Sequence, residues 1–428
     1  MSKYRDNKLL FFYQLILAIT FVFVFFTNFD VYWNHAIGTP QPKNLVILFG
    51  LASLPLLLSF ASRIKYISKS LCFWIYGYVF ISLTSFILYA NYEPIASSEE
   101  IRTRILSAVF MLLSSLIFSC PKVLQWVRWE ILMITFMNVI ANVYSLFYPD
   151  NFVTIIEDQS VLETSRAAGF YVDANRATCI LVLGLIFSIT LLPQKYRLPF
   201  IFLIFIGAFV TFSRSGLISF LVVTFIMIFA RQIRLFHKKM LFWAVSLGII
   251  AWILLNSIGL SWLNIGNVEE TVFENRNLER ITQLQPNADK RELDDLSSER
   301  LPIVEKTWDE FLESPIWGNG IGYGLKLEAD IIGKKSHNMY LSYMLEHGFL
   351  GALFLPLLVF CSTHNASRSD KYICFAFSAL ILIWAFFSHN ILEHREFLMS
   401  FSLMSTISVT SELEPNFQDS DRKLVFKS

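Results

Sequence analysis

The sequence is poor in charge and in cysteine for a chain of 428 residues. Lys, Arg, Asp and Glu make up 16% of it, against 55% hydrophobic residues, which leaves too little polar area to cover a soluble globule. The net charge is +1 and no large basic domain is present, which argues against nucleic-acid binding. The five cysteines lack the CxxC spacing of a metal or redox pair, so the sequence predicts neither.

Long apolar runs are what the sequence has in abundance, and its mean hydropathy is +0.52. Runs of about 16 to 24 residues are long enough, or nearly so, to cross the ~30 Å hydrocarbon layer as helices. We therefore predict an all-α, polytopic membrane protein with about twelve transmembrane helices in a single domain over residues 1–428. The predicted spans are residues 9–27, 45–61, 71–90, 105–120, 129–148, 177–193, 197–212, 216–230, 240–258, 338–361, 371–389 and 396–412.

The distribution of cations predicts the topology. Twelve spans with both termini in the cytoplasm place nineteen Lys and Arg residues on the inner side, as the positive-inside rule requires. The short outer loops then hold seven, namely Lys43, Arg102, Arg104, Arg166, Arg176, Arg214 and Arg395. Runs 197–212 and 216–230 are alternatively one bent segment, which would invert the topology that follows. The cation count favours two helices in a hairpin, with Arg214 at its outer mouth.

One long polar segment interrupts the apolar runs, and we predict that residues 259–337 form a large outer loop between the ninth and tenth spans. Within it, the stretch SSERLPIVEKTWDEFLES predicts a helix that Ser297 caps and that has Arg300 in its first turns. Pro315 ends this pattern, and the glycine-rich GNGIGYG from Gly318 to Gly324 leads back to the membrane.

Chemically useful side chains gather on the predicted outer side. His337 stands where the long loop enters a span, a position suited to handling protons beside a membrane-bound substrate. Arg214 lies in the tight turn Phe212–Gly216, where a guanidinium suits a phosphate. Arg166, Asn175 and Arg176 lie in the smaller outer segment 149–176 and, with Asn338 and Glu346, are possible supporting residues of the site. A cation at a helix end more often only snorkels or fixes topology, and this is the favoured interpretation of Arg176.

Three blocks of sequence occur in a characteristic order: TFSRSG at 211–216, ERLPIVEKTWDEFLESPIWGNGIGYG at 299–324 and HNMYLSYMLEHGFLG at 337–351. Together they resemble the bacterial O-antigen ligase and O-antigen polymerase superfamily. The resemblance covers about residues 160–360 and is vague over the first five helices.

This resemblance implies a metal-independent glycosyltransferase of the GT-C type, without a cofactor. Such an enzyme moves a glycan from undecaprenyl pyrophosphate to an acceptor hydroxyl at the periplasmic face of the bacterial inner membrane. By matching motifs, Arg214 and Arg300 hold the diphosphate, while His337 is the catalytic base or a further pyrophosphate contact. The expected outer loops contain no DxD motif for a metal.

Other polar residues near His337 have structural interpretations. Asn338 is expected to cap or orient the helix. Glu346 lies nine residues after His337, roughly on the opposite face of an ideal helix, so we predict that it hydrogen-bonds within a network to another helix. His389 and Glu393 have helical i, i+4 spacing, which fits either a second acid/base pair or a polar collar around a turn, and we favour the collar.

Three functions remain open from the sequence. A ligase transfers the glycan to the lipid A core, and a polymerase transfers it to a second lipid-linked glycan; we favour the ligase by a small margin. The third is a transporter of lipid-linked sugars, which predicts repeated halves and a polar pathway at the membrane midplane. No internal repeat is evident and the polar residues gather on one face, which disfavours transport.

Overall fold

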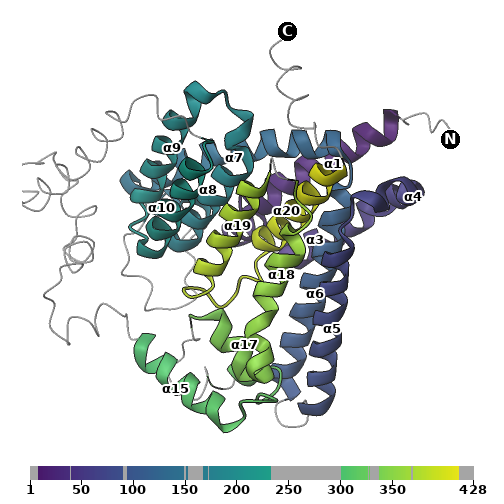
Figure 1. The fold of residues 1–428 in the computed structure, drawn as a ribbon, viewed down its shortest axis with the longest axis vertical. Helices are drawn as coiled ribbons and strands as arrows, with labels where there is room; N and C mark the ends of the chain where they lie inside the picture. The colour runs from purple at the N-terminus through teal and green to yellow at the C-terminus, as the bar shows by residue number, and fades with distance from the viewer. Residues whose placement is uncertain are drawn as a thin grey trace, which may run out of the picture.

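The computed structural model describes residues 8–38, 40–89, 94–148, 151–152, 167–171, 173–232, 300–325, 327, 337–367 and 370–413. The predicted span 240–258, most of the predicted loop 259–337, and Arg166 lie outside these residues. Within the described ranges the chain is helical and contains no β-strand, so the predicted all-α class is confirmed. The helices, joined by short 3₁₀ turns, are α1 (Lys8–Phe26), α2 (Phe29–Ile37), α3 (Pro42–Ser53), α4 (Phe60–Arg63), α5 (Lys69–Tyr89), α6 (Pro94–Phe118), α7 (Pro121–Phe147), α8 (Ala174–Ser188), α9 (Gln194–Phe209), α10 (Arg214–Phe229), α15 (Arg300–Glu313), α17 (Met339–His347), α18 (Phe354–Thr363), α19 (Lys371–Trp384) and α20 (Arg395–Leu413) (Figure 1).

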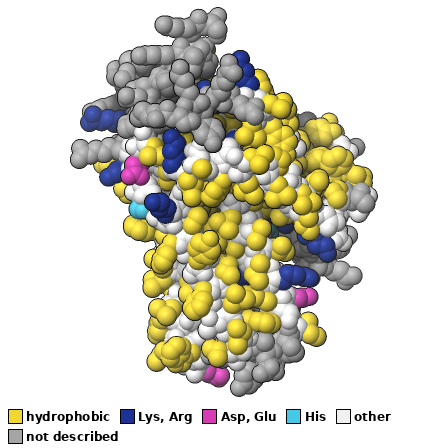
Figure 2. Space-filling model, turned by 90° about the vertical axis from the view of Figure 1, so that its right-hand side faces the viewer, with side chains coloured by type: hydrophobic (Ala, Val, Ile, Leu, Met, Phe, Trp, Pro, Cys, Tyr) yellow, Lys and Arg dark blue, Asp and Glu magenta, His cyan; other side chains and the backbone are white. Residues whose placement is uncertain are grey.

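Seven helical stretches of the described chain are long and apolar enough to cross a membrane. They are Lys8–Phe26, Pro42–Tyr66, Lys69–Leu88, Ile95–Phe118, Pro121–Phe147, Ala174–Leu191 and Met339–Thr363. Large apolar side chains such as Phe73, Phe80 and Ile87 of α5 point outward, and hydrophobic atoms cover most of the described surface in Figure 2. Because exposing such an apolar surface to water costs free energy, the surface is suited to contact with lipid. The multi-pass membrane architecture is therefore confirmed, while the count of about twelve stays a prediction.

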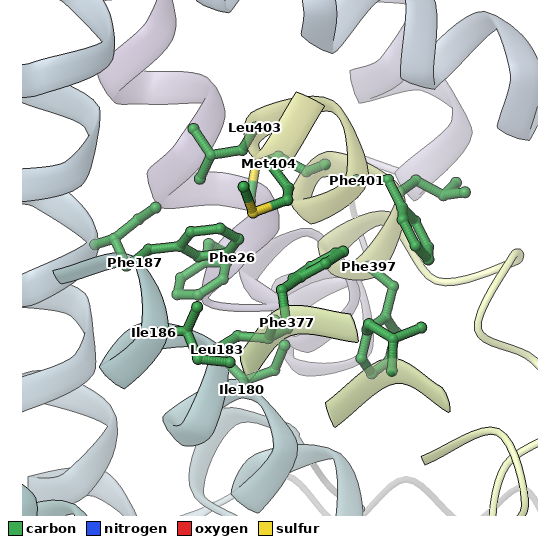
Figure 3. Packing of buried hydrophobic residues seen from close by; sticks show 14 of the residues in the cluster. Phe26, Ile180, Leu183, Ile186, Phe187, Phe377, Phe397, Phe401, Leu403 and Met404 are labelled. Carbon is green, nitrogen blue, oxygen red and sulfur yellow. The ribbon is translucent and has the colours of Figure 1, made fainter. Parts of the chain in front are cut away.

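The centre of the bundle is α8, which is buried along nearly its whole length. It packs against α7, α9, α10 and α19, as expected for a helix that is apolar all round. Phe187 of α8, Phe377 of α19 and Phe401 of α20 form part of this core (Figure 3), and the last two rings meet edge to face at 5.5 Å. Small hydroxyl residues line α20 and allow it to approach α6 closely, where Ser402 Oγ donates to the carbonyl of Met111 at 2.8 Å.

Two helices begin earlier than the sequence predicted. The predicted spans 105–120 and 129–148 are the apolar parts of α6 and α7, which begin at Pro94 and Pro121. Proline suits the first position of a helix, because its missing N–H has no partner there in any case. The assignment of Arg104 to a short outer loop was therefore wrong, since the residue belongs to α6 and its side chain is buried.

The predicted span 338–361 is not one straight helix. Its composition is continuous, yet α17 ends at His347 and the chain doubles back before α18. Gly348 adopts φ +67°, and Gly351 lies directly against the backbone of Tyr343. The rings of Tyr343 and Phe354 are 5.4 Å apart, whereas eleven residues of a straight helix extend roughly 16 Å. Hydropathy predicted the length of this apolar run but not the reversal, which depends on two glycines.

Gly351→Ala should destabilise the protein, because a Cβ at this position would overlap the carbonyl oxygen of Tyr343. We expect a loss of about 1–3 kcal/mol, as for other overpacked sites. Thermal unfolding of the detergent-solubilised protein measures it. Gly77→Ala in α5 is the matched control, since a Cβ at Gly77 meets nothing within 4 Å. Equal melting temperatures for the two variants would contradict the close approach.

Candidate functional site

The first turns of α8, α10 and α20 meet at one end of the bundle, which we call the Arg214 end. Asp173 caps α8 by accepting from the Asn175 N–H at 2.8 Å, and Ser213 caps α10 by accepting from the Gly216 N–H at 3.1 Å. The hydroxyl of Ser213 also donates to Asn175 Oδ1 at 2.8 Å. This bond joins the start of α8 to the turn between α9 and α10, so the predicted supporting residue Asn175 lies beside the Arg214 turn.

Arg214 is the first residue of α10 and is half-buried. The chain reverses from α9 to α10 through Phe212, whose φ of 52° is unusual for a residue with a large side chain. Thr211 and Thr178 place their hydroxyls 2.6 Å apart and fasten this turn to α8. The prediction of two helices in a hairpin, rather than one bent segment, is confirmed. A guanidinium at a helix N-terminus adds its charge to the positive end of the helix dipole, which favours an anion.

Arg176 is held by partners within the protein. Its Nη2 and Nε atoms lie 2.5 and 3.0 Å from Glu396 Oε1, and Nη2 donates to Asn28 Oδ1 at 3.1 Å. The guanidinium also lies over the ring of Tyr171, 6.0 Å from its centroid. Arg176 therefore ties α8 to α20 and to the end of α1, an ion-paired role that differs from the snorkelling or topology role favoured from the sequence.

A second ion pair lies next to the first, between Arg395 Nε and Asp30 Oδ2 at 2.5 Å. Burial raises the pKa of the Asp30 carboxyl above its usual value, and the Arg395 guanidinium opposes that rise. Arg395 and Glu396 are consecutive, so the two pairs place alternating charges side by side at the start of α20. This arrangement could not be predicted from the sequence, because its four residues lie in three distant segments.

His337 precedes α17 and is half-buried. Asn338 caps that helix by accepting from the Leu341 N–H at 3.2 Å, as predicted. The Met339 N–H donates to the carbonyl of Ala385 at 2.9 Å, so the start of α17 is bonded to the end of α19. The ring of His337 lies 5.4 Å, centroid to centroid, from the ring of His389.

Residues 385–394 form turns between α19 and α20, which we call the 385–394 loop. The predicted span 371–389 was therefore too long, and the helical i, i+4 pairing of His389 with Glu393 was wrong. α19 ends at Trp384, and the chain turns there. The carbonyl of the next residue, Ala385, accepts from the Met339 N–H of α17. The apolar run continues past the end of α19, so hydropathy placed the boundary too late.

Arg300 is the first residue of α15, and its side chain is not described. Figure 1 shows α15 beside α17, with the first residues of both helices on the same side of the pair. Their last residues are joined through the segment 314–320, where the Asn319 N–H donates to Leu345 at 2.8 Å and the Phe349 N–H donates to Pro315 at 2.9 Å. The backbone of Arg300 therefore starts from the side on which His337 lies.

A chain of contacts links the Arg214 turn to His337. Ser213 contacts Asn175, the neighbouring Arg176 pairs with Glu396, and Glu396 directly follows the loop that brings His389 to His337. α10 also packs against α19, the helix that leads into the 385–394 loop. Arg214 and His337 thus belong to one end of the bundle. In the described ranges no three His, Cys, Asp or Glu side chains gather as metal ligands would, and the metal-free reaction stays a prediction.

Glu346 lies apart from His337 in a buried ionic network. Its Oε2 pairs with Arg104 Nη2, and its Oε1 accepts from the Gly322 N–H at 3.0 Å. Arg104 also reaches His347 Nε2 at 2.6 Å and Glu100 Oε1 at 3.0 Å. This network fixes the segment after α15 between α6 and α17. The predicted structural role of Glu346, as part of a network to another helix, agrees with these contacts.

One family of known proteins matches the chain, over residues 199–356, and its description is O-antigen ligase. Residues 199–356 are similar to this family, and we call them the ligase domain. The ligase domain contains Arg214, Arg300, His337, Asn338 and Glu346, and it supports the family that the sequence motifs resemble. Asn175 and the 385–394 loop contact it from outside the matched residues. No curated protein matches the chain.

Sequence reasoning missed Arg104 and Glu396 and gave His389 only a secondary role. Arg104 and Glu396 were visible as charges inside or beside apolar runs, which is where an ion pair is needed to offset desolvation. Their partners were not visible, because contacts over 220 or more residues follow from helix packing rather than from local pattern.

Removing one member of the Arg104–Glu346 pair should cost far more stability than removing both. Glu346→Leu leaves the buried Arg104 guanidinium with only one of the two carboxylates described here, that of Glu100, and we expect a loss of about 3 kcal/mol. The double variant Arg104→Met/Glu346→Leu should recover much of that loss. Thermal unfolding of the two single variants and the double variant gives the coupling. Additive losses would show that the pair is not coupled.

Proposed function

We propose that this protein is a membrane glycosyltransferase of the O-antigen ligase type. It moves a glycan from undecaprenyl pyrophosphate to a hydroxyl of the lipid A core at the periplasmic face of the inner membrane. The observation that carries the proposal is the convergence of the Arg214 turn and His337 at one end of the bundle, within the ligase domain. Arg300 joins them by the position of its backbone at the start of α15.

The residues suit a transfer that needs no metal. The acceptor oxygen forms a bond to the anomeric carbon of the sugar, while the bond from that carbon to the pyrophosphate oxygen breaks. The pyrophosphate leaves with the electron pair, and the acceptor proton passes to His337. Guanidinium groups of Arg214 and Arg300 meet the charge that develops on the leaving pyrophosphate. Glu346 takes no part in this step, because its carboxylate is engaged by Arg104 and Gly322.

The same proposal assigns the sides of the membrane. The Arg214 end faces the periplasm, about twelve spans cross the inner membrane, and both termini are cytoplasmic. Residues 259–337 then form a periplasmic loop whose helix α15 delivers Arg300. Lys122 and Lys195, near the starts of α7 and α9, belong to the opposite end, which agrees with the positive-inside rule.

A polysaccharide polymerase is the second candidate, because it uses the same lipid pyrophosphate donor and differs only in the acceptor. The matched family supports either enzyme. A transporter of lipid-linked sugars is disfavoured, because the sequence shows no internal repeat of the kind on which many transporter folds are built.

Product analysis tests the assignment. Purified protein receives a defined undecaprenyl-pyrophosphate glycan together with either a core lipid or a second portion of the same donor. We expect a new glycosidic bond only with the core lipid, detected by mass spectrometry. Chains of joined repeat units would establish the polymerase instead, and unchanged lipids in both reactions would contradict both enzymes. His337→Ala is the negative control, and we expect at least about a hundredfold less product if His337 is the base.

Arg214→Lys should impair use of the donor, because an ammonium keeps the charge but loses the planar fork that binds phosphate oxygens in pairs. We expect kcat/KM for the donor to fall by at least about tenfold, which corresponds to roughly 1.4 kcal/mol. The acceptor KM should change little. Arg102→Lys, an exposed arginine of α6, is the matched control. Near-normal donor kinetics for Arg214→Lys would remove Arg214 from the pyrophosphate site.

A further inference from the structure

His389 lies against the residue that the proposed mechanism uses as its base. The centroids of the His337 and His389 rings are 5.4 Å apart, and the ring planes are inclined at 59°. At this separation one nitrogen of each imidazole can approach the other to about 3 Å, which is hydrogen-bonding distance. Two histidines therefore stand together at the Arg214 end, although 52 residues separate them in the sequence.

The position of His389 is fixed by bonds on both sides. Before it, the carbonyls of Ala385 and Leu382 accept from the Met339 N–H at 2.9 Å and from the Tyr340 hydroxyl at 3.0 Å. After it, the carbonyl of Asn390 accepts from the N–H of Glu393 at 3.0 Å and from that of His394 at 3.2 Å. The bonds from Met339 and Tyr340 tie the end of α19 and the start of the 385–394 loop to α17, while the bonds to Asn390 close a turn within the loop. A shift at the start of the loop would therefore also move the segment that carries His337.

The far end of the same loop is held by charge. Arg395 and Glu396, which follow it directly, pair with Asp30 and Arg176. Both partners lie on other helices, so α2 and α8 restrain the loop as well. Because His389 is already held in place, little further conformational entropy is lost when it orients the ring of His337. A supporting group in a reaction site needs this kind of preorganisation.

We infer that His389 is a positioning residue of the transfer reaction, which hydrogen-bonds His337 and stabilises its imidazolium after the acceptor proton has been taken. This inference rests on the proposed function. A base that accepts a proton becomes a cation in a half-buried place, and a neutral imidazole beside it is a good acceptor for the new N–H. The bonds that form and break remain those of the glycosyl transfer, and His389 neither gains nor loses an atom.

The kinetic test compares three substitutions at His389. His389→Phe keeps a ring of similar width but removes the hydrogen bond, and we expect kcat to fall at least about tenfold with the donor KM unchanged. His389→Asn and His389→Gln keep a polar group near one or the other ring nitrogen. We expect at least one of them to retain most of the wild-type kcat. His35→Phe, an exposed histidine of α2, is the matched control.

Wild-type kcat in His389→Phe would overturn the inference. So would an equal loss of kcat in all three variants together with a lowered melting temperature, since that pattern belongs to a purely structural residue. A rise in donor KM alone would also overturn it, because it would place His389 in donor binding.

A second measurement tests the proximity of residues 337 and 389 without measuring turnover. In a cysteine-free background, His337→Cys/His389→Cys should be joined by a short bifunctional thiol reagent in native membranes, whereas His337→Cys/His35→Cys should not. Absence of the first cross-link would overturn the pairing. If the wild-type protein forms no product while the cross-link forms, the proposed function fails and the assisting role fails with it, but the contact between the two positions stands.

Discussion

The arginines Arg104, Arg128 and Arg176 each contact carboxylate, carbonyl or hydroxyl oxygens inside the protein, and the bundle depends on these contacts. A guanidinium removed from water is costly unless carboxylates or carbonyl oxygens take its place. Arg104 meets Glu346 and Glu100, and Arg176 meets Glu396. Arg128 reaches the carbonyl of Phe187 at 2.9 Å and the hydroxyl of Thr190 at 2.5 Å. The Arg104–Glu100 pair lies within α6, whereas the other contacts join different helical segments of the chain.

These ties divide the cations of the Arg214 end by role. Arg176 and Arg395 hold α8, α20 and α2 together through carboxylates, which makes them parts of the frame. Arg214 begins α10 in a turn that Ser213, Thr211 and Thr178 fasten to α8. These contacts therefore fix the position of the Arg214 backbone. The proposed phosphate contact requires that fixed position.

Composition and apolar periodicity predicted the class of the protein and most of its helices, because burial in lipid demands long apolar runs whatever their partners are. The helix starts at Pro94 and Pro121 were missed because polar first turns of a helix look like loop in a hydropathy pattern. The reversal at Gly348 was missed because glycine conformation leaves hydropathy unchanged. The sequence motifs identified Arg214 and His337 as candidate site residues. The contact between His337 and His389 could not be predicted, because it depends on tertiary packing.

The 385–394 loop lies beyond the end of the matched residues at 356, yet it supplies the ring of His389, whose centroid lies 5.4 Å from that of the His337 ring. The segment that matches the family and the segment that supplies the proposed partner of His337 are therefore different pieces of chain. Exchange of residues 199–356 between two relatives would transplant the recognisable motifs while leaving α8, the 385–394 loop and α20 from the recipient. Functional chimeras should place their junctions ahead of α8 and after α20, so that the motifs travel with the surroundings to which they are fitted.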